Sequence, residues 1–515
     1  MSRSGTWRGT RGGTDRSGVR GTVRGGWFGF LGSAVTAVFG FLLVTVVTRA
    51  AGAAQAGAVF TGVAAFTVAT HASKLGADTG LVRFVSRDLA TTGGAGVPAL
   101  LRTAVLPGAA LSTVGAVVLL AAPDLATGLL PELSPGQARS VVRMFAVCWP
   151  VTTVSLVLLG ATRGHGTVLP FVGVEQVGKP VLRVLLALPV AVLAPGVLGL
   201  SAAWLLPSLL GAVAAALAVR RLTRALGPGP ATPPGQSRAF WAFSGPRAVS
   251  SVCDIAAVWI GVLVLSAVSG SAEAGIYTAI GRLVTAGTLL QLAVRLAVAP
   301  QISRTMAGGD LAGAEHLHRL STRWIVLFSW PLFVLLAAFP GTALGIFGAG
   351  FASGATALAV LSVACAVNVA VGNAQTVILM AGRSTWNLAV AGAASVVQVG
   401  CAVVLVPRHG VLGAALAFAA AMVLDNVASA LLVRRRLRFT TVDRGYAAAA
   451  GVGLCGVAAV ALPTRLLAGD GPAGLVAAAV LACGAVAVGT WRYREALGAA
   501  EFLGALRQRP ARELP

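Results

Sequence analysis

The chain is a succession of long apolar runs separated by short polar segments that carry most of the arginines. A run of about 20 apolar residues is long enough to cross the roughly 30 Å hydrocarbon core of a membrane as a helix. We predict about 14 such helices, at residues 27–48, 57–80, 104–122, 144–162, 168–194, 198–219, 245–268, 275–299, 324–347, 355–379, 385–406, 411–433, 446–462 and 472–490. Residues 307–323 have the pattern of a helix at the membrane surface, with Asp310 as its N-cap.

Two of these runs resemble each other closely. Residues 196–221 read GVLGLSAAWLLPSLLGAVAAALAVRR, and residues 410–435 read GVLGAALAFAAAMVLDNVASALLVRR. A weaker echo pairs Gly57, just after the first run, with Gly275, just after the seventh. The repetition predicts two homologous lobes of six helices each. Because six is an even number, the lobes are parallel repeats, related by an axis along the membrane normal.

The pattern also divides the chain into parts of different composition. Two apolar lobes are joined by a linker rich in proline and glycine, a pair of helices follows the second lobe, and basic segments form both ends. We expect a disordered basic tail at 1–26, lobes at 27–222 and 242–438, the linker at 223–241, helices 13 and 14 at 439–491 and a second basic tail at 492–515.

Composition predicts an all-α, multi-pass membrane protein. Hydrophobic residues make up 57% of the 515 residues and charged residues 11%, which is too little polar surface to cover a water-soluble core. Of the 39 Lys and Arg residues, 29 fall on one side of the predicted membrane, five fall on the other side and five lie at membrane depth. This asymmetry predicts that both termini are cytoplasmic in a protein of the cell membrane.

The net charge of +23 raises the question of nucleic acid binding. Arginines between apolar runs are typical of membrane proteins that meet anionic lipids, so we expect lipid and no nucleic acid as the partner of the basic segments. The six cysteines have no metal-ligand spacing, and the single GxGxxG match, at 469–474, has no preceding strand. We therefore expect no enzymatic activity, no cofactor and no metal site, which leaves transport.

Charged residues inside the predicted helices are the candidates for function. Each costs about 2.5–3.5 kcal/mol to insert, so each needs a partner or a wet cavity. Lys74 and Asp78 lie four residues apart on one helix face, as do Glu175 and Lys179. For these residues, internal pairing that fixes helix packing is as reasonable a role as contact with a substrate.

The eighth predicted helix carries Arg282 and Arg295 and no acidic residue. Arg295 is close enough to the cytoplasmic end to extend to the headgroups. Arg282 lies about 10 Å below the outer face at 1.5 Å per residue, and a planar guanidinium at that depth suits a diphosphate. Arg282 is therefore our first candidate for binding a substrate headgroup, followed by Lys74, Arg83 and Arg247.

Two acidic residues of the second lobe could couple transport to an ion gradient. Asp254 lies in the seventh predicted helix and Asp425 in the twelfth, and with Asn387 or Gln398 they could bind Na⁺ or a proton. A structural role is the alternative, in which Asp254 pairs with Arg247 on its own helix and Asp425 meets the arginines at the cytoplasmic end.

Several short motifs resemble those of bacterial polysaccharide flippases of the multidrug/oligosaccharidyl-lipid/polysaccharide exporter superfamily. Residues 75–83 read LGADTGLVR, and the second lobe contains AGIY at 274–277, MAGR at 380–383 and VPRHG at 406–410. The likeness covers about residues 40–438 and consists of glycine and proline positions. The resemblance implies a V-shaped, two-lobe transporter that flips undecaprenyl-diphosphate-linked sugar repeat units to the outer leaflet by alternating access. Polysaccharide polymerases and glycosyltransferases would be its partners in surface polysaccharide assembly.

Three alternatives stay open. A cation-coupled multidrug antiporter of the same superfamily would place net negative charge in its cavity. The lipid II flippase has the same predicted topology but carries charged residues in its first span, whereas residues 28–48 here have none. A membrane scaffold that recruits a polymerase or glycosyltransferase would explain the basic tails but not the buried charges.

Overall fold

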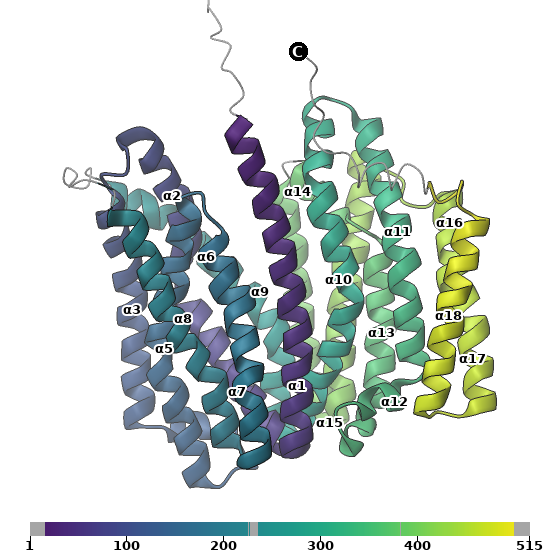
Figure 1. Ribbon diagram of the computed structural model, residues 1–515, viewed down its shortest axis with the longest axis horizontal. Coiled ribbons are helices and arrows are strands. Elements are labelled where there is room, and N and C mark those ends of the chain that lie inside the picture. The colour runs from purple at the N-terminus through teal and green to yellow at the C-terminus, as the bar shows by residue number, and fades with distance from the viewer. Residues whose placement is uncertain (1–15, 225, 227–234, 382, 499–515) are drawn as a thin grey trace, which may run out of the picture.

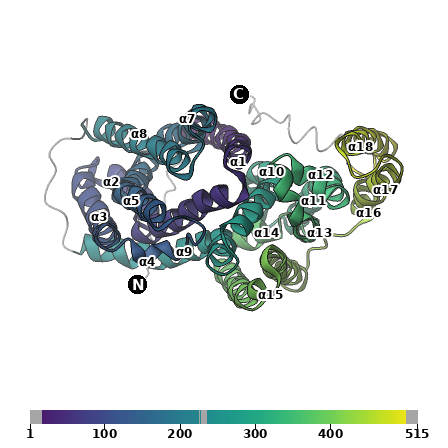
Figure 2. The ribbon, with the colours of Figure 1, turned by 90° about the horizontal axis from the view of Figure 1, so that it is seen from below.

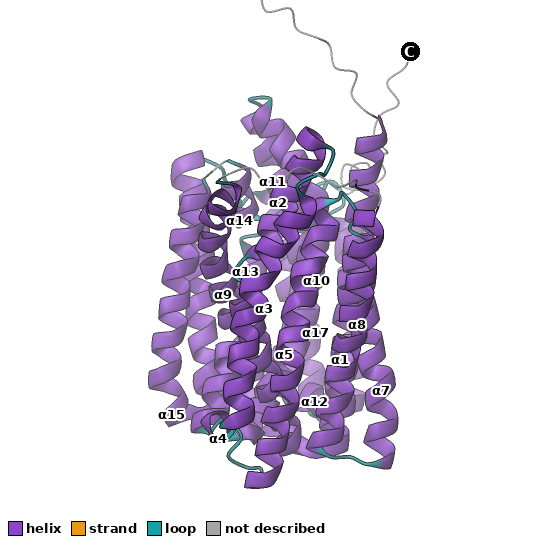
Figure 3. Ribbon diagram, turned by 90° about the vertical axis from the view of Figure 1, so that its left-hand side faces the viewer, coloured by secondary structure: helices purple, strands orange, loops and turns teal. Residues whose placement is uncertain are grey.

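The protein is a bundle of long helices that run side by side (Figures 1 and 3). The computed structural model describes residues 16–224, 226, 235–381 and 383–498, and this part of the chain contains no strand. Twelve of the described helices are long and apolar enough to cross a membrane. The all-α, multi-pass architecture predicted from the hydrophobic pattern is thus confirmed. It follows from the need to satisfy backbone hydrogen bonds within each segment in hydrocarbon.

Two helices contain a glycine with non-helical dihedral angles. Helix α1 (Arg16–Ser73) has 58 residues with Gly52 at φ 71°, and α15 (Ser384–Leu432) has 49 residues with Gly410 at φ 51°. Straight helices of these lengths would measure about 87 Å and 74 Å, against a hydrocarbon core of about 30 Å. Each therefore has the length of two crossings. The predicted count of about 14 rests on counting each of them twice, and it stays a prediction.

The N-terminal half of the bundle consists of α1 to α8. The first segment of α1, before Gly52, stands between the rest of this half and α10 (Figures 1 and 2). The other elements are α2 (Ala77–Thr92), α3 (Val97–Ala121), α4 (Asp124–Thr127), α5 (Pro135–Gly164), α6 (Leu169–Phe171), the π-helix η1 (Val172–Gly178), α7 (Lys179–Leu193) and α8 (Val197–Arg224).

The C-terminal half consists of α9 to α15. Its elements besides α15 are α9 (Gln236–Val268), α10 (Ser271–Ala307), α11 (Leu311–Ala338), α12 (Pro340–Gly345), the 3₁₀-helix η2 (Ala349–Gly354), α13 (Ala355–Ala370), α14 (Ala374–Met380) and, after α15, the π-helix η3 (Val433–Leu437). The relation of the two halves as homologous lobes stays a prediction. Of the linker predicted at 223–241, residues 223–224 belong to α8 and 236–241 to α9, and residues 225 and 227–234 lie outside the described residues.

The last helices pack against the side of the C-terminal half. They are α16 (Arg444–Ala450), the π-helix η4 (Gly451–Gly456), α17 (Val457–Ala468) and α18 (Pro472–Arg492), and they lie at one edge of the molecule (Figure 2). Their main partner is α11. Arg323 of α11 forms an ion pair with Asp443, the N-cap of α16, and donates to the backbone oxygen of Ala496 at 3.1 Å. The ion pair fixes the start of α16, and with it the last helices, to α11.

Several sequence predictions about helix boundaries are wrong. The span predicted at 324–347 ends at Ala338, and the one predicted at 355–379 is interrupted between Ala370 and Ala374. The second predicted span does not continue to residue 80, because Leu75 and Gly76 have positive φ angles and the chain turns into α2. No separate surface helix forms at 307–323. Asp310 does cap a helix, since its carboxylate accepts from the Gly313 amide at 2.8 Å, but that helix is α11 and continues unbroken into the span.

The start of α1 and the end of α18 lie at the same end of the bundle (Figure 1). Arg434, Arg435 and Arg436 belong to η3, which directly follows α15, and Arg492, the last residue of α18, lies at this end of the bundle. We call it the basic end, and the other end the far end. The predicted orientation places the basic end in the cytoplasm.

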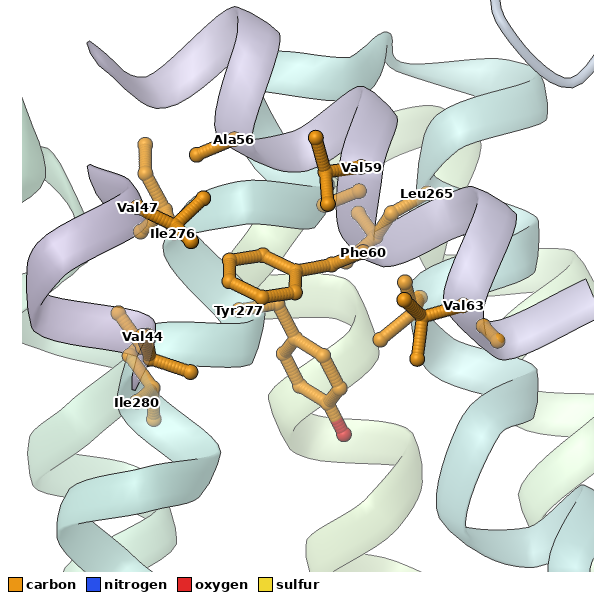
Figure 4. Close-up of a cluster of buried hydrophobic side chains, with 14 of the residues drawn as sticks. Val44, Val47, Ala56, Val59, Phe60, Val63, Leu265, Ile276, Tyr277 and Ile280 are labelled. Carbon is orange, nitrogen blue, oxygen red and sulfur yellow. The ribbon is translucent and has the colours of Figure 1, made fainter. Parts of the chain in front are cut away.

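The halves share one apolar core near the far end (Figure 4). Val44, Val47 and Phe60 of α1 pack with Ile276 and Tyr277 of α10, and all five are buried. Lipid is as apolar as these side chains, so close packing rather than exclusion of water stabilises this contact. The far end is therefore closed in this structure.

Helix α9 contacts both halves. Near the basic end its Phe240 is fully buried and packs against Phe84 of α2, with ring centroids 5.5 Å apart. α9 also packs on α1, α10 and α15. Gly245 and Pro246 follow Phe240 along the helix, and the backbone of Arg247 and Ala248 beyond them lies against Gly76.

Candidate functional site

Arg282 of α10 lies deep in the bundle. It is eleven residues from the far end of α10 at Ser271, or about 17 Å at 1.5 Å per residue. Its guanidinium approaches the first segment of α1, where a Cβ built on Gly40 would lie 3.5 Å from Nη1. Within the described part of the chain, this guanidinium has no hydrogen bond and no ion pair. The charge is thus placed at mid-membrane without a protein partner among these residues.

Arg183 of α7 is a second deep arginine, and the sequence analysis did not select it. Its Nε donates to the backbone oxygen of Trp204 at 3.1 Å, its Nη2 donates to Ser208 at 3.3 Å, and its Cζ lies 3.8 Å from the centre of the Trp204 ring. It lies within electrostatic range of both Glu175 and Arg282. Two arginines from opposite halves thus contribute positive potential to the same region.

The first segment of α1 lies between these two groups. Thr36 donates to the backbone oxygen of Gln176 in η1 at 2.8 Å, and the Gln176 side chain fills the space next to Gly32. Gly32, Thr36 and Gly40 are four residues apart and therefore share one helix face. We call this the small-residue face. Gly32 and Thr36 lie against η1, and Gly40 lies next to Arg282.

Lys74 is committed to ion pairs. Its Nζ lies 3.2 Å from Asp78 Oδ2, and Arg163 Nη2 lies 3.5 Å from the same oxygen. The other predicted helical pair also forms, with Lys179 Nζ 2.6 Å from Glu175 Oε2. The internal pairing inferred from four-residue spacing is therefore present at both sites. Contact of Lys74 with a substrate stays a prediction, and it would have to compete with Asp78.

Arg83 and Arg247 lie at the basic end, on the two sides of the α2–α9 contact. Arg83 is exposed, and its Cζ lies 4.5 Å from the centre of the Phe243 ring of α9. Arg247 is also exposed, and its backbone passes next to Gly76. The structure thus gathers Arg83 and Arg247 near Lys74 and separates all three from Arg282.

The C-terminal half contains a cavity of about 620 Å³ between α9, α10, α13, α14 and α15, which we call the C-half cavity. Asp254, Asp425 and Gln398 all line it, whereas Asn387 does not. Asp425 accepts a hydrogen bond from the side-chain amide of Gln375. The structure therefore brings together both acidic residues predicted for ion coupling.

The structural alternatives for these acids are not observed. Among the described residues, neither Asp254 with Arg247 nor Asp425 with the arginines at the basic end forms an ion pair within 4.0 Å. Arg295, which we expected to extend to the headgroups, lines the C-half cavity instead. Three charged residues of the C-terminal half, Asp254, Arg295 and Asp425, thus line the same cavity.

A smaller pocket of about 160 Å³ in the N-terminal half has a different lining. Its walls come from α1, α3, α4 and α5 and include Phe66, Phe145 and Trp149. It has no charged lining residue, so it offers nothing to an ionic headgroup.

At the far end, polar contacts join the halves in addition to the apolar core. Arg49 Nε donates to the backbone oxygen of Ile346 at 2.7 Å, and Ser266 donates to the backbone oxygen of Leu129 at 2.7 Å. Between them α1 and α10 cross at Gly57, whose Cβ, if present, would lie 1.6 Å from the backbone oxygen of Ser271. Only glycine permits this approach. The far end is therefore held by a backbone-to-backbone contact between the halves.

The fold is shared with solved membrane transporters. The lipid II flippase MurJ, in an inward closed conformation, superposes with a TM-score of 0.74 at 11% identity over 91% of this chain and 99% of that chain. An inward-facing multidrug resistance MATE transporter of the MOP superfamily gives 0.65 at 15% identity over 78% of this chain and 95% of that chain. A MOP superfamily transporter from Pyrococcus furiosus, described as having a reversed binding-pocket polarity, gives 0.54 at 16% identity over 82% and 96%.

These similarities define the class: a multi-pass membrane protein with the fold of the MOP superfamily transporters. Residues 22–306, more than half of the chain, match the polysaccharide biosynthesis protein family. The chain belongs to that family. Among curated proteins, no sequence matches it.

Proposed function

We propose that this protein flips undecaprenyl-diphosphate-linked oligosaccharide repeat units from the cytoplasmic to the outer leaflet, for the assembly of a surface polysaccharide. The observation that carries the proposal is Arg282, a guanidinium at mid-membrane that has no partner among the described residues. A diphosphate would supply charge-assisted, bidentate hydrogen bonds to it. Membership of the polysaccharide biosynthesis family supports a lipid-linked sugar as the cargo.

The arrangement of charges supports a path in two stages. The exposed Arg83 and Arg247 would attract the anionic headgroup at the basic end. The headgroup would then move between the halves to Arg282, with Arg183 raising the local positive potential. Because η1 occupies the small-residue face of α1 in this structure, its contacts at Gly32 and Thr36 would have to open for passage along that face. Because the far end is closed, release requires the halves to separate there, as alternating access demands.

Two further functions remain as candidates. A cation-coupled drug antiporter is favoured by one observation, the two carboxylates of the C-half cavity, since net negative charge would attract a cation. Against it, Arg282 and Arg183 would repel a cationic drug. A lipid II flippase is favoured by the overall fold, but no charged residue occupies positions 28–48. The proposal includes ion coupling at Asp254 and Asp425. It also includes association with a polymerase or glycosyltransferases.

The test is export of polysaccharide by a host that lacks its own repeat-unit flippase. Arg282→Ala is expected to abolish surface polymer while the lipid-linked repeat unit accumulates, and Arg282→Lys to restore it only in part, because a point charge replaces a planar fork. Arg183→Gln should reduce export less, since Trp204 and Ser208 already hold that side chain.

The matched control is Arg465→Ala, which removes an exposed arginine whose surface pair with Asp470 has its charged atoms 3.7 Å apart. Protein level and monodispersity in detergent are measured for each variant. Normal export by Arg282→Ala at wild-type protein level would show that the headgroup assignment is wrong.

A further inference from the structure

We propose that the C-half cavity binds the sugar residues of the headgroup, and so selects which oligosaccharide is flipped. This inference rests on the proposed function and assigns a place to the part of the substrate that the arginines do not recognise. The cavity, at about 620 Å³, falls within the range of roughly 300–1,000 Å³ typical of sites for organic ligands. At about 30 Å³ for each water, a single hydrated ion would leave most of it empty.

The lining carries a set of side-chain amides whose orientation is fixed by their partners. Gln398 Nε2 donates to the backbone oxygen of Ala257 at 2.6 Å, and Asn426 Nδ2 donates to that of Met422 at 2.8 Å. A backbone oxygen can only accept, so the nitrogen of each amide must face it. Each amide thus retains its side-chain oxygen and one N–H for another partner.

The same logic applies on the opposite wall. Gln291 donates to the backbone oxygen of Gly372 at 3.1 Å, and its own side-chain oxygen accepts from Asn368 Nδ2 at 3.4 Å. Gln375 donates to the carboxylate of Asp425. The side-chain oxygens of Asn368 and Gln375 therefore accept no hydrogen bond from the described residues.

Asn373 belongs to the same wall. Its side chain is only 3% exposed and lines the cavity, and its Nδ2 donates to Ser321 at 3.4 Å. Its Oδ1 has no hydrogen-bond partner among the described residues, but it is closed off from solvent. Recognition of hydroxyl groups is therefore assigned to the other amides, those of Gln398, Asn426, Asn368 and Gln375.

Sugar hydroxyls fit this lining better than an ion or a drug does. A hydroxyl group both donates and accepts, and the amides offer oxygens and remaining N–H groups at several points of the wall. The aromatic rings of Tyr277 and Phe418 supply apolar surface for the C–H faces of a sugar ring. An ion would need only the two carboxylates, those of Asp254 and Asp425, and would leave the amides of the wall without a role.

The position of the cavity next to Arg282 supports the same assignment. Gly281, Thr285 and Thr288 of α10 line the cavity, whereas Arg282 approaches α1. At 100° per residue, Arg282 lies about 60° from Thr285 and about 20° from Leu289 around α10, and both of these residues line the cavity. The side of α10 that carries Arg282 therefore borders the cavity, and a diphosphate held there would lie beside it. A sugar attached directly to that diphosphate would enter it.

The experiment compares two probes on the purified full chain in vesicles of neutral phosphatidylcholine. One probe is undecaprenyl diphosphate, and the other is undecaprenyl diphosphate that carries a neutral disaccharide. We expect the wild type to bind the sugar-bearing probe at least about tenfold more tightly, because its hydroxyl groups add hydrogen bonds to the cavity amides.

Gln398→Met and Asn368→Leu keep the size of each side chain but remove its amide. Each is expected to lower the affinity for the sugar-bearing probe by about three- to tenfold and to leave the affinity for the sugar-free probe unchanged. Arg282→Ala should weaken both probes. Thr464→Val, which removes one hydroxyl from α17 outside the cavity, is the control, and thermal unfolding of each variant checks the fold.

Equal affinity of the wild type for the two probes would overturn the inference while leaving the proposed function intact. A preference for the sugar-bearing probe that is unchanged in Gln398→Met and Asn368→Leu would also overturn it. Binding of neither probe by the wild type would instead refute the proposed function, and this inference with it.

Discussion

Closure of the far end depends on Gly57, and its replacement should block the transport cycle. A Cβ at this position would lie 1.6 Å from the backbone oxygen of Ser271 and 2.9 Å from the backbone nitrogen of Gly275. A carbon approaches a backbone oxygen to about 3.3 Å at best, so α1 and α10 would have to separate by about 1.7 Å. Forcing extra volume into a close-packed contact costs about 1–3 kcal/mol.

That cost falls only on the conformation in which the far end is closed. A differential of 1–3 kcal/mol shifts the equilibrium between two conformations by about five- to 150-fold. Gly57→Ala should therefore favour the conformation open at the far end and reduce export of polysaccharide by at least about fivefold. The control is Gly400→Ala, because a Cβ at Gly400 meets nothing within 4 Å and the gain in helix propensity is the same.

The assay has two readouts, surface polymer in the flippase-deficient host and closure of the far end in membranes. Closure is measured by crosslinking Arg49→Cys to Ile346→Cys, whose parent side chain and backbone are hydrogen-bonded at 2.7 Å. Gly57→Ala is expected to reduce the crosslinked fraction, and Gly400→Ala to leave it unchanged. Export and crosslinking at wild-type levels in Gly57→Ala would refute the argument that this crossing tolerates only glycine.

Two further predictions concern charged groups. If Asp254 and Asp425 couple flipping to an ion gradient, the wild type in vesicles will flip substrate faster with an imposed Na⁺ or proton gradient. Asp425→Asn will remove that dependence. Equal rates with and without both gradients would exclude the coupling role. Burial raises the pKa of Asp443, but the hydrogen bonds from Arg323 and from the Tyr446 backbone outweigh burial, so the pKa is lowered overall. The ion pair therefore stabilises the protein at neutral pH, and this stabilisation is lost as the pH falls through the lowered pKa. Arg323→Ala is therefore expected to lower the thermal unfolding temperature at pH 7 by several degrees, and to do so much less at a pH where Asp443 is protonated; the same loss at both pH values would contradict an electrostatic origin.

Much of the fold could be predicted because a membrane leaves few choices. The requirement for internally satisfied backbone hydrogen bonds makes every long apolar run a helix, so the run positions give the helices directly. The wrong boundaries occur where a turn and a continuous helix have the same hydropathy. A turn at Leu75 and Gly76 and the continuous start of α11 depend on local dihedral angles and on packing, which apolar character does not encode.

The parts of the candidate site that could be predicted are those whose residues are close in sequence. The pair Glu175–Lys179 follows from four-residue spacing on one continuous helix, whereas Lys74 and Asp78, predicted on one helix, pair across the turn at Leu75 and Gly76. Arg183 was missed because its partners lie more than 20 residues away on α8. The amides of the C-half cavity were missed as a group for the same reason, since their convergence is a property of the tertiary structure.

The attachments of α9 have a mechanical consequence. This helix contacts the N-terminal half near both of its ends, through Phe240 against Phe84 and through Ser266, which donates to the backbone oxygen of Leu129, and it also packs on α10 and α15 of the C-terminal half. Opening of the far end would break the Ser266 contact and leave the Phe240 contact at the basic end. Pro246 removes one backbone hydrogen bond, and a side chain added at Gly245 would meet nothing within 4 Å, so resistance to bending is lowest at this point. A bend there would let the far part of α9 move with the C-terminal half while Phe240 stays on α2.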